Sequence, residues 1–199
     1  AYEIDLVVIK VRKNEITGEY SLGLSVDAVH CALETAKIVI AELDDTMPFT
    51  QGQSVISEED IDFIITDGVK PVYTFEPPDF ENLSAPEKRI GELIAEHFLD
   101  DGMTLQVGIG KIPDAVIGTI SNGAFKDLGV QTELYGDGLM HLQKKGIINN
   151  KQKKINTGYS TTSLIMGSKT LYDFVHLRSQ VQMRPCIYTN SAQTVRDCG

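Results

Sequence analysis

Residues 3–11 read EIDLVVIKV, a nearly continuous run of aliphatic side chains that decides the fold class. Such a run is typical of a strand buried on both faces of a parallel sheet. Residues 25–36 follow with apolar side chains at helical spacing, and KIVIAEL (37–43) returns as a second buried-type strand. Residues 44–57 predict an irregular loop, and IDFIITD (61–67) predicts a further strand. The order strand, helix, strand predicts an α/β fold with a mostly parallel sheet.

The middle of the chain changes character at PVYTFEPPDFENLSAP (71–86), which is rich in proline and has little periodicity. We interpret this stretch as a linker between two domains. Residues 1–70 are then the end of one α/β domain, and residues 87–199 are the first part of another. The chain also begins without a methionine, directly before a strand-like run, so we expect both domains to be incomplete here.

The second half repeats the alternation of strands and helices. Ser84 followed by Glu87 predicts a capping box for a helix over 87–102, whose apolar side chains predict one buried face made of Ile90, Leu93, Ile94 and Phe98. A strand is predicted over 103–110, and a helix begins near Pro113. Further strands are predicted at 128–134 and 162–167, and further helices at 138–146 and 169–177.

Charge and cysteine content exclude several classes of function. The formal net charge of -10 disfavours nucleic acids and anionic membranes as partners, and no apolar run is long enough to span a bilayer. The only basic stretch, NKQKKIN (150–156), is interpreted as a solvated lysine-rich connection. Cys31, Cys186 and Cys198 are odd in number and lack CxxC spacing, which favours a reducing compartment over a disulfide framework or a zinc site.

The first stretch with chemical potential is GIGKIP (108–113), where a predicted strand turns into a helix. Glycines there let the backbone approach a ligand, and the helix start offers free N–H groups to a pyrophosphate or an oxyanion. A dinucleotide-binding interpretation is weak, because the first acid after the helix is Asp127, in a polar loop. A tight strand-to-helix turn without any ligand remains an equal alternative.

The second stretch is LGVQTELYGDGL (128–139), which places Glu133 at the end of a predicted strand. The carboxyl ends of parallel strands are where open α/β sheets bind ligands, and a carboxylate there can attack an activated carbonyl. A surface ion pair or a place in a first helical turn is the commoner fate of such a residue. Asp137 could hydrogen-bond Glu133, but capping the next helix is its more ordinary role.

Taken together, these segments resemble the acetyl-CoA hydrolase/transferase family, and most of all its 4-hydroxybutyrate and butyrate CoA-transferases. The resemblance extends over about residues 3–188. In the second half it is carried by LQVGIGKIPDAV (105–116), LGVQTELYGDG (128–138), GIINNKQKK (146–154) and LIMGSKTLYDFV (164–175). In the first half it is carried by IDLVVIKV (4–11), GLSVDAV (23–29), AKIVIAEL (36–43) and MPFTQG (47–52).

The resemblance implies a pair of related open, mostly parallel-sheet domains of the NagB/RpiA-like type, with the active site between them. It implies that Glu133 is the catalytic nucleophile and forms a glutamyl-CoA thioester. It also implies that the loop of Gly108, Ile109, Gly110, Lys111 and Ile112 contacts coenzyme A. Coenzyme A is then a substrate, and neither a permanently bound cofactor nor a metal is required.

The function expected from the resemblance is transfer of CoA between a short-chain acyl-CoA and a carboxylic acid of the acetate, butyrate or 4-hydroxybutyrate class. A homo-oligomer in the cytoplasm is expected, with the mitochondrial matrix as the other possible compartment. Two alternatives stay open. One is an acyl-CoA hydrolase of the same family, and the other is a truncated, non-catalytic CoA-binding module.

Overall fold

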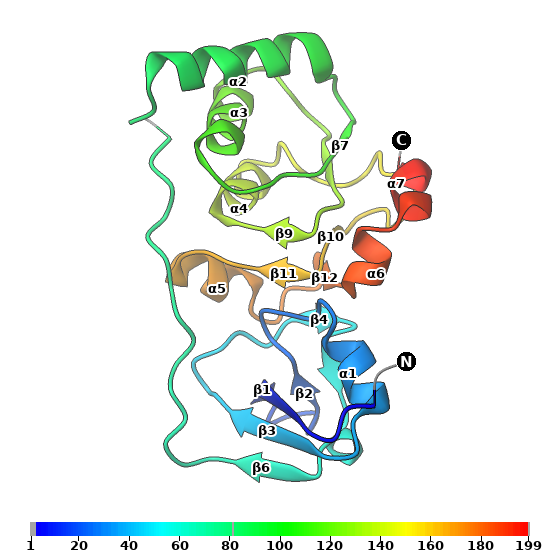
Figure 1. The fold of residues 1–199 in the computed structure, drawn as a ribbon. Helices are drawn as coiled ribbons and strands as arrows, with labels where there is room; N and C mark the ends of the chain where they lie inside the picture. Colours follow the sequence, from blue (N-terminus) through cyan, green and yellow to red (C-terminus); the bar gives the residue numbers. More distant parts are fainter. Residues whose placement is uncertain (1–2, 81, 199) are drawn as a thin grey trace.

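The computed structural model describes residues 3–80 and 82–198, and its short, mostly parallel sheets confirm the α/β class (Figure 1). The N-terminal half forms the lower part of the view and the C-terminal half the upper part. Buried side chains from both halves, from Ile9 to Met183, form one contiguous core cluster. Within the described residues, no helix is both long and apolar enough to cross a bilayer.

The lower part is a five-stranded sheet in the order β5-β2-β1-β3-β6. β1 (Val7–Lys13), β3 (Val39–Leu43) and β6 (Phe63–Ile65) are parallel, and Val7 pairs with Val39. The predicted strand, helix, strand order is confirmed, with α1 (Val29–Thr35) shorter than predicted. β2 (Tyr20–Ser21) and β5 (Val55–Ile56) add to the sheet in antiparallel orientation.

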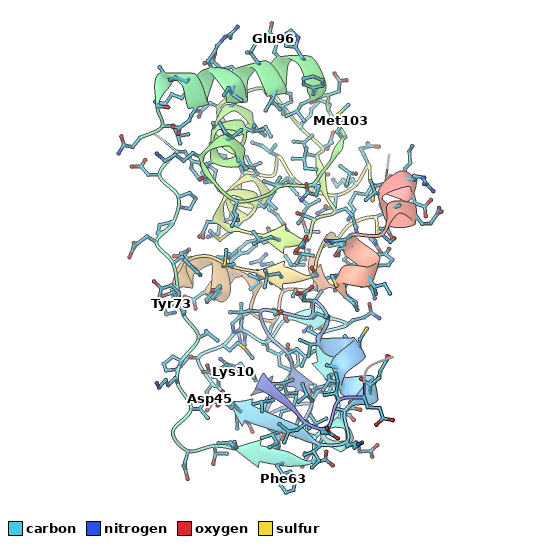
Figure 2. The ribbon with its side chains drawn as sticks, viewed as in Figure 1. Lys10, Asp45, Phe63, Tyr73, Glu96 and Met103 are labelled. Atoms are coloured by element: carbon cyan, nitrogen blue, oxygen red, sulfur yellow. The ribbon has the colours of Figure 1, made fainter. Side chains whose placement is uncertain are left out.

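Burial on both faces of this sheet was a wrong prediction. Val11 is fully buried, but Val8 is 57% exposed and Phe63 is 61% exposed. Figure 2 shows Phe63 projecting outward from the lower edge of the molecule. Side chains alternate along each strand, so the buried residues of β1 lie on one face of the sheet and Val8 lies on the other. An aliphatic run therefore predicted the strand correctly and the number of covered faces incorrectly.

Residues 44–57, predicted as an irregular loop, contain two short strands, β4 (Gln51–Gly52) and β5, and a short 3-10 helix, η1 (Glu58–Asp60), follows them. β4 joins a three-stranded sheet whose other members, β10 (Ser160–Thr162) and β12 (Val181–Met183), come from the C-terminal half. Gly52 pairs there with Met183 in parallel register. The N-terminal and C-terminal halves are therefore joined by backbone hydrogen bonds as well as by the core.

The proline-rich stretch runs along one side of the molecule from β6 to α2 and forms neither helix nor strand before Ala85, within its described residues (Figure 1). It is tied to the C-terminal half at two points. The Tyr172 hydroxyl donates to the Tyr73 carbonyl at 3.0 Å, and the Phe75 N–H donates to the Gly167 carbonyl at 2.9 Å. Figure 2 places Tyr73 on the outer side of this extended segment.

Helix α2 (Ala85–Phe98) confirms the predicted capping box, because Ser84 and Glu87 each accept a hydrogen bond from the other's backbone N–H. The predicted apolar face is wrong. Gly91 and Ala95 are the buried residues, whereas Ile90 is 41% exposed and Phe98 is 72% exposed. Small side chains let α2 approach α3 closely: a Cβ on Gly91 would lie 2.7 Å from the backbone carbon of Ala115.

The remaining elements are short and follow the predicted alternation. The strand predicted over 128–134 is interrupted, giving β8 (Gly129–Val130) and β9 (Leu134–Tyr135). β8 pairs with β7 (Thr104–Leu105), and β9 pairs with β11 (Leu164–Ile165), both in parallel. The helices are α3 (Lys111–Asn122), α4 (Asp137–Lys144), α5 (Lys169–Val175), α6 (Cys186–Thr189) and α7 (Ala192–Cys198).

Candidate active site

The glycine loop lies where β7 leads into α3, as the sequence predicted. Gly110 is the residue before the helix, with φ of +118°, a left-handed conformation that favours glycine, and no side chain caps the helix start. The N–H groups of the first helical turn have no partner within the helix, and Pro113 has no N–H. The amides of Lys111 and Ile112 are therefore available to an anion at the positive end of the helix dipole.

The glycine loop forms part of the wall of a cavity of about 280 Å³. β7, β9 and β11 each lead into a helix, and the first turns or preceding residues of α3, α4 and α5 border this space. The extended segment 75–78 closes another side. The lining residues are Phe75, Glu76, Pro78, Val107, Gly108, Ile109, Gly110, Asp114, Ile117, Leu134, Gly136, Asp137, Gly138, Leu139, Met166 and Gly167.

Two carboxylates of the cavity wall have different surroundings. Asp137 is buried, and it accepts hydrogen bonds from the N–H and the hydroxyl of Ser168, so it ties the start of α4 to the start of α5. It neither caps α4 nor bonds Glu133, which corrects both sequence-based alternatives. Asp114 lies in the first turn of α3, where partial burial raises the pKa of its carboxyl.

Glu133 lies in the bend between β8 and β9, and its side chain is exposed. Its carboxylate Oε2 accepts a hydrogen bond of 2.7 Å from Nδ2 of Asn190, which follows α6. Its backbone carbonyl accepts from the N–H groups of Ser163 and Leu164 at 3.0 and 2.9 Å and from the Thr162 hydroxyl at 2.8 Å. The backbone of the bend is therefore firmly held while the carboxylate stays accessible.

The structure connects the glycine loop and Glu133 through Thr132. The Thr132 hydroxyl lies 3.2 Å from both the N–H and the carbonyl of Val107, the residue that precedes Gly108. Leu134 lines the glycine cavity, and Glu133 does not. The backbones of the two predicted site segments are thus brought together, while the Glu133 carboxylate is directed to Asn190.

Sequence reasoning missed Asn190 and Lys153. Asn190 lies 57 residues from Glu133 in the chain, and no local pattern marks the pairing. Lys153 was predicted to be solvated with its lysine neighbours, but it is only 4% exposed, whereas Lys151 and Lys154 are exposed. Alternation of exposed and buried residues in an irregular segment has no periodic signal, so only the fold reveals it. Within the described part of the chain, no group of three or more His, Cys, Asp or Glu is placed to hold a metal ion.

Comparison with known proteins matches this architecture to one family. Residues 1–76 match the acetyl-CoA hydrolase/transferase N-terminal domain. The 4-hydroxybutyrate coenzyme A transferase of Clostridium kluyveri is 41% identical over 94% of this chain and 42% of the relative. The succinyl-CoA:acetate/propanoyl-CoA:succinate CoA transferase of Fasciola hepatica is 35% identical over 95% of this chain and 38% of the relative.

A solved structure agrees. The crystal structure of 4-hydroxybutyrate CoA-transferase from Porphyromonas gingivalis is 39% identical, with a TM-score of 0.87 over 98% of this chain and 48% of that one. The chain belongs to the acetyl-CoA hydrolase/transferase family. It spans about two fifths of the length of the curated relatives named above.

Proposed function

We propose that the protein transfers CoA between a short-chain acyl-CoA and a carboxylic acid of the acetate, butyrate or 4-hydroxybutyrate class. The observation that carries the proposal is the placement of Glu133. Its carboxylate is exposed and oriented by Asn190, on a backbone held by β10 and β11, beside a glycine loop with free helical N–H groups. The named activities of the similar proteins support the same class of reaction.

In the proposed reaction a carboxylate oxygen of Glu133 attacks the acyl-CoA carbonyl, and the CoA thiolate leaves. The thiolate then attacks the glutamyl carbonyl of the resulting anhydride, which releases the first carboxylic acid and forms a glutamyl-CoA thioester. A second carboxylic acid reverses these steps and leaves as its CoA ester. The energy of the thioester is conserved throughout, so neither ATP nor a metal is needed.

The glycine loop supplies binding in this proposal. The backbone of Gly108, Ile109, Gly110, Lys111 and Ile112 contacts CoA, and the uncapped start of α3 stabilises a phosphate or a developing oxyanion. A carboxylate is a weak nucleophile, so CoA binding energy must be used to position the thioester beside Glu133. The Asn190 hydrogen bond holds the carboxylate in one orientation before the thioester arrives.

The domain organisation belongs to the same proposal. Residues 1–70 form the end of an N-terminal CoA-transferase domain, residues 71–86 the linker, and residues 87–199 the first part of a C-terminal domain, both of the NagB/RpiA-like type. The extended course of the proline-rich segment supports the division (Figure 1). We also propose that the protein acts as a homo-oligomer in the cytoplasm, which suits its three free cysteines.

An acyl-CoA hydrolase is the second candidate, because the exposed side chain of Glu133 leaves its carboxylate accessible to water. Water that reaches the glutamyl thioester would release CoA without an acceptor acid. A non-catalytic CoA-binding module is the third possibility, since the chain spans less than half of its named relatives.

The test is intact-mass spectrometry of the chain after mixing with butyryl-CoA, followed by borohydride reduction. We expect a CoA adduct that borohydride converts to an alcohol at residue 133. Glu133→Gln should form no adduct, whereas Glu96→Gln, an exposed glutamate on the outer surface of α2, should behave as the unmodified chain (Figure 2).

Product analysis with and without acetate then separates the activities. Acetyl-CoA formed only when acetate is present supports the transferase, and free CoA formed at the same rate without acetate supports the hydrolase. CoA binding with neither adduct nor turnover would contradict both and leave the binding module.

A further inference from the structure

Lys153 places an ammonium group in the interior, beside the strand that leads to Glu133. Its Nζ donates to the carbonyls of Val130 and Tyr159 at 2.7 and 2.6 Å and to the Thr161 hydroxyl at 3.2 Å. The strand β8 is shaped around its aliphatic stem: a Cβ on Gly129 would lie 2.4 Å from Cγ of Lys153. The ammonium therefore uses all three of its N–H donors inside the protein.

The acceptors of this ammonium lie on the two chain segments that frame the bend at Glu133. Val130 ends β8, and Thr161 lies in β10. Gln131 forms a parallel bridge with Thr161, and the Thr132 N–H donates to the Thr161 carbonyl at 3.0 Å. The ammonium thus cross-links the two segments immediately before the chain turns to expose the glutamate.

We propose that Lys153 is a positioning residue for Glu133, because its ammonium locks β8 to β10 and so sets the bend that exposes the carboxylate. The inference rests on the proposed function for the role of Glu133. The contacts that carry it stand independently of that role.

Keeping this charge inside the protein is unfavourable, which argues for a functional purpose. Burial lowers the pKa of Lys153 to about 8, and each of its three hydrogen-bond acceptors is an uncharged oxygen. The titratable group that faces it is the Cys198 thiol of α7, whose own pKa is raised by burial. Asp197, also on α7, acts on that thiol. Perturbed lysines with built hydrogen-bond shells gather at functional sites.

Loss of the proton changes the cross-link. A neutral amine has two N–H donors for three acceptors, so the Thr161 hydroxyl must reorient or lose its contact. The bend loosens, and the rate of attack by Glu133 falls as the pH rises through about 8. Global stability moves the other way, since the burial of the charge is relieved over the same range. A purely structural lysine would make rate and stability change together.

The first experiment compares Lys153→Met with Lys151→Met, an exposed neighbour. Formation of the glutamyl adduct from butyryl-CoA is timed by rapid-quench mass spectrometry, and CoA affinity is measured by calorimetry. Misplacing a nucleophile costs on the order of 100-fold in rate. We expect a slowing of that order in Lys153→Met with CoA affinity unchanged, and no slowing in Lys151→Met. Equal rates in the two variants, or equal losses of rate and affinity, would overturn the proposal.

The second experiment does not depend on catalysis. In the unmodified chain the backbone amide resonances of Gln131 and Thr132 should shift with a midpoint near pH 8, while those of β1 and β3 should not. The titration should persist in Cys198→Ser and disappear in Lys153→Met.

These results separate the inference from the proposed function. A titration without any adduct would refute the catalytic role of Glu133 and keep the lock by Lys153. No titration, or one that disappears in Cys198→Ser, would overturn the inference even if Lys153→Met does not fold.

Discussion

The sheet formed by β1, β3 and β6 and the region around the glycine cavity are both built from parallel strands, but they treat the strand ends differently. The lower strands lead mainly into hairpins and loops, and α1 contains no buried residue. In the upper region β7, β9 and β11, only two residues each, lead into helices whose first turns meet at one cavity. The lower sheet accordingly leaves an apolar face exposed, whereas the upper region encloses a space fit for a ligand.

The difference shows that strand length is no guide to where a site forms. Long strands give the lower sheet its register, but ligand-binding groups are the free N–H groups of helix starts and the glycines beside them. Those groups gather only where successive strands end at the same edge and each continues into a helix. Four substitutions or titrations test this comparison, in order of decreasing effect.

The largest effect is expected from Ile117→Ala. Ile117 is 2% exposed, lines the glycine cavity and packs in the core cluster, so its removal enlarges an existing space. Truncation of such a residue costs about 4 kcal/mol of unfolding free energy. Urea denaturation followed by circular dichroism measures it. A loss below about 1 kcal/mol would mean that the cavity wall is packed as loosely as the exposed sheet face.

The pH dependence of stability gives the next largest effect. An unfolded lysine keeps its proton up to its ordinary pKa of 10.5, whereas native Lys153 releases it at about 8. Between these values the unfolded state binds more protons, so the unfolding free energy rises with pH, by about 3 kcal/mol in total. Urea denaturation from pH 7 to pH 10.5 should show this rise in the unmodified chain relative to Lys153→Met. Parallel curves for the two proteins would contradict the buried charge.

Gly167→Ala tests the close contact between the starts of α4 and α5. A Cβ at Gly167 would lie 2.1 Å from Oδ2 of Asp137, and that carboxylate is held by Ser168. Overpacking of this kind costs about 2 kcal/mol. Gly136→Ala is the matched control in the same cavity, because its Cβ would meet only ordinary contacts, the nearest at 3.6 Å. Thermal unfolding should separate the two variants, and equal melting temperatures would refute the contact.

The smallest effect is expected from Phe63→Thr in the lower sheet. Phe63 is 61% exposed, and threonine keeps the β propensity of the edge strand. The unfolding free energy should change by about 0.5 kcal/mol or less. A loss of several times that size, measured by the same urea titration, would show that the exposed face of this sheet is more tightly packed than its side-chain exposure indicates.

Much of the organisation was predictable from the sequence. The aliphatic runs that become β1 and β3, the capping box of Ser84 and Glu87, and the strand-to-helix turn at the glycine loop were all predicted correctly. The family followed from the same segments. These features depend on contacts between residues close in the chain, so hydrophobic periodicity and capping chemistry are sufficient to identify them.

The sequence by itself therefore determined the order of elements, the glycine loop and the family. Only the tertiary structure decided that α2 packs through Gly91 and Ala95, that Glu133 lies in a bend facing Asn190, and that Lys153 is buried. In each case the deciding partner lies far away in the chain or in an irregular segment. Periodicity reports which side chains share a face, but the closeness of backbones and the burial of a charge depend on what that face meets.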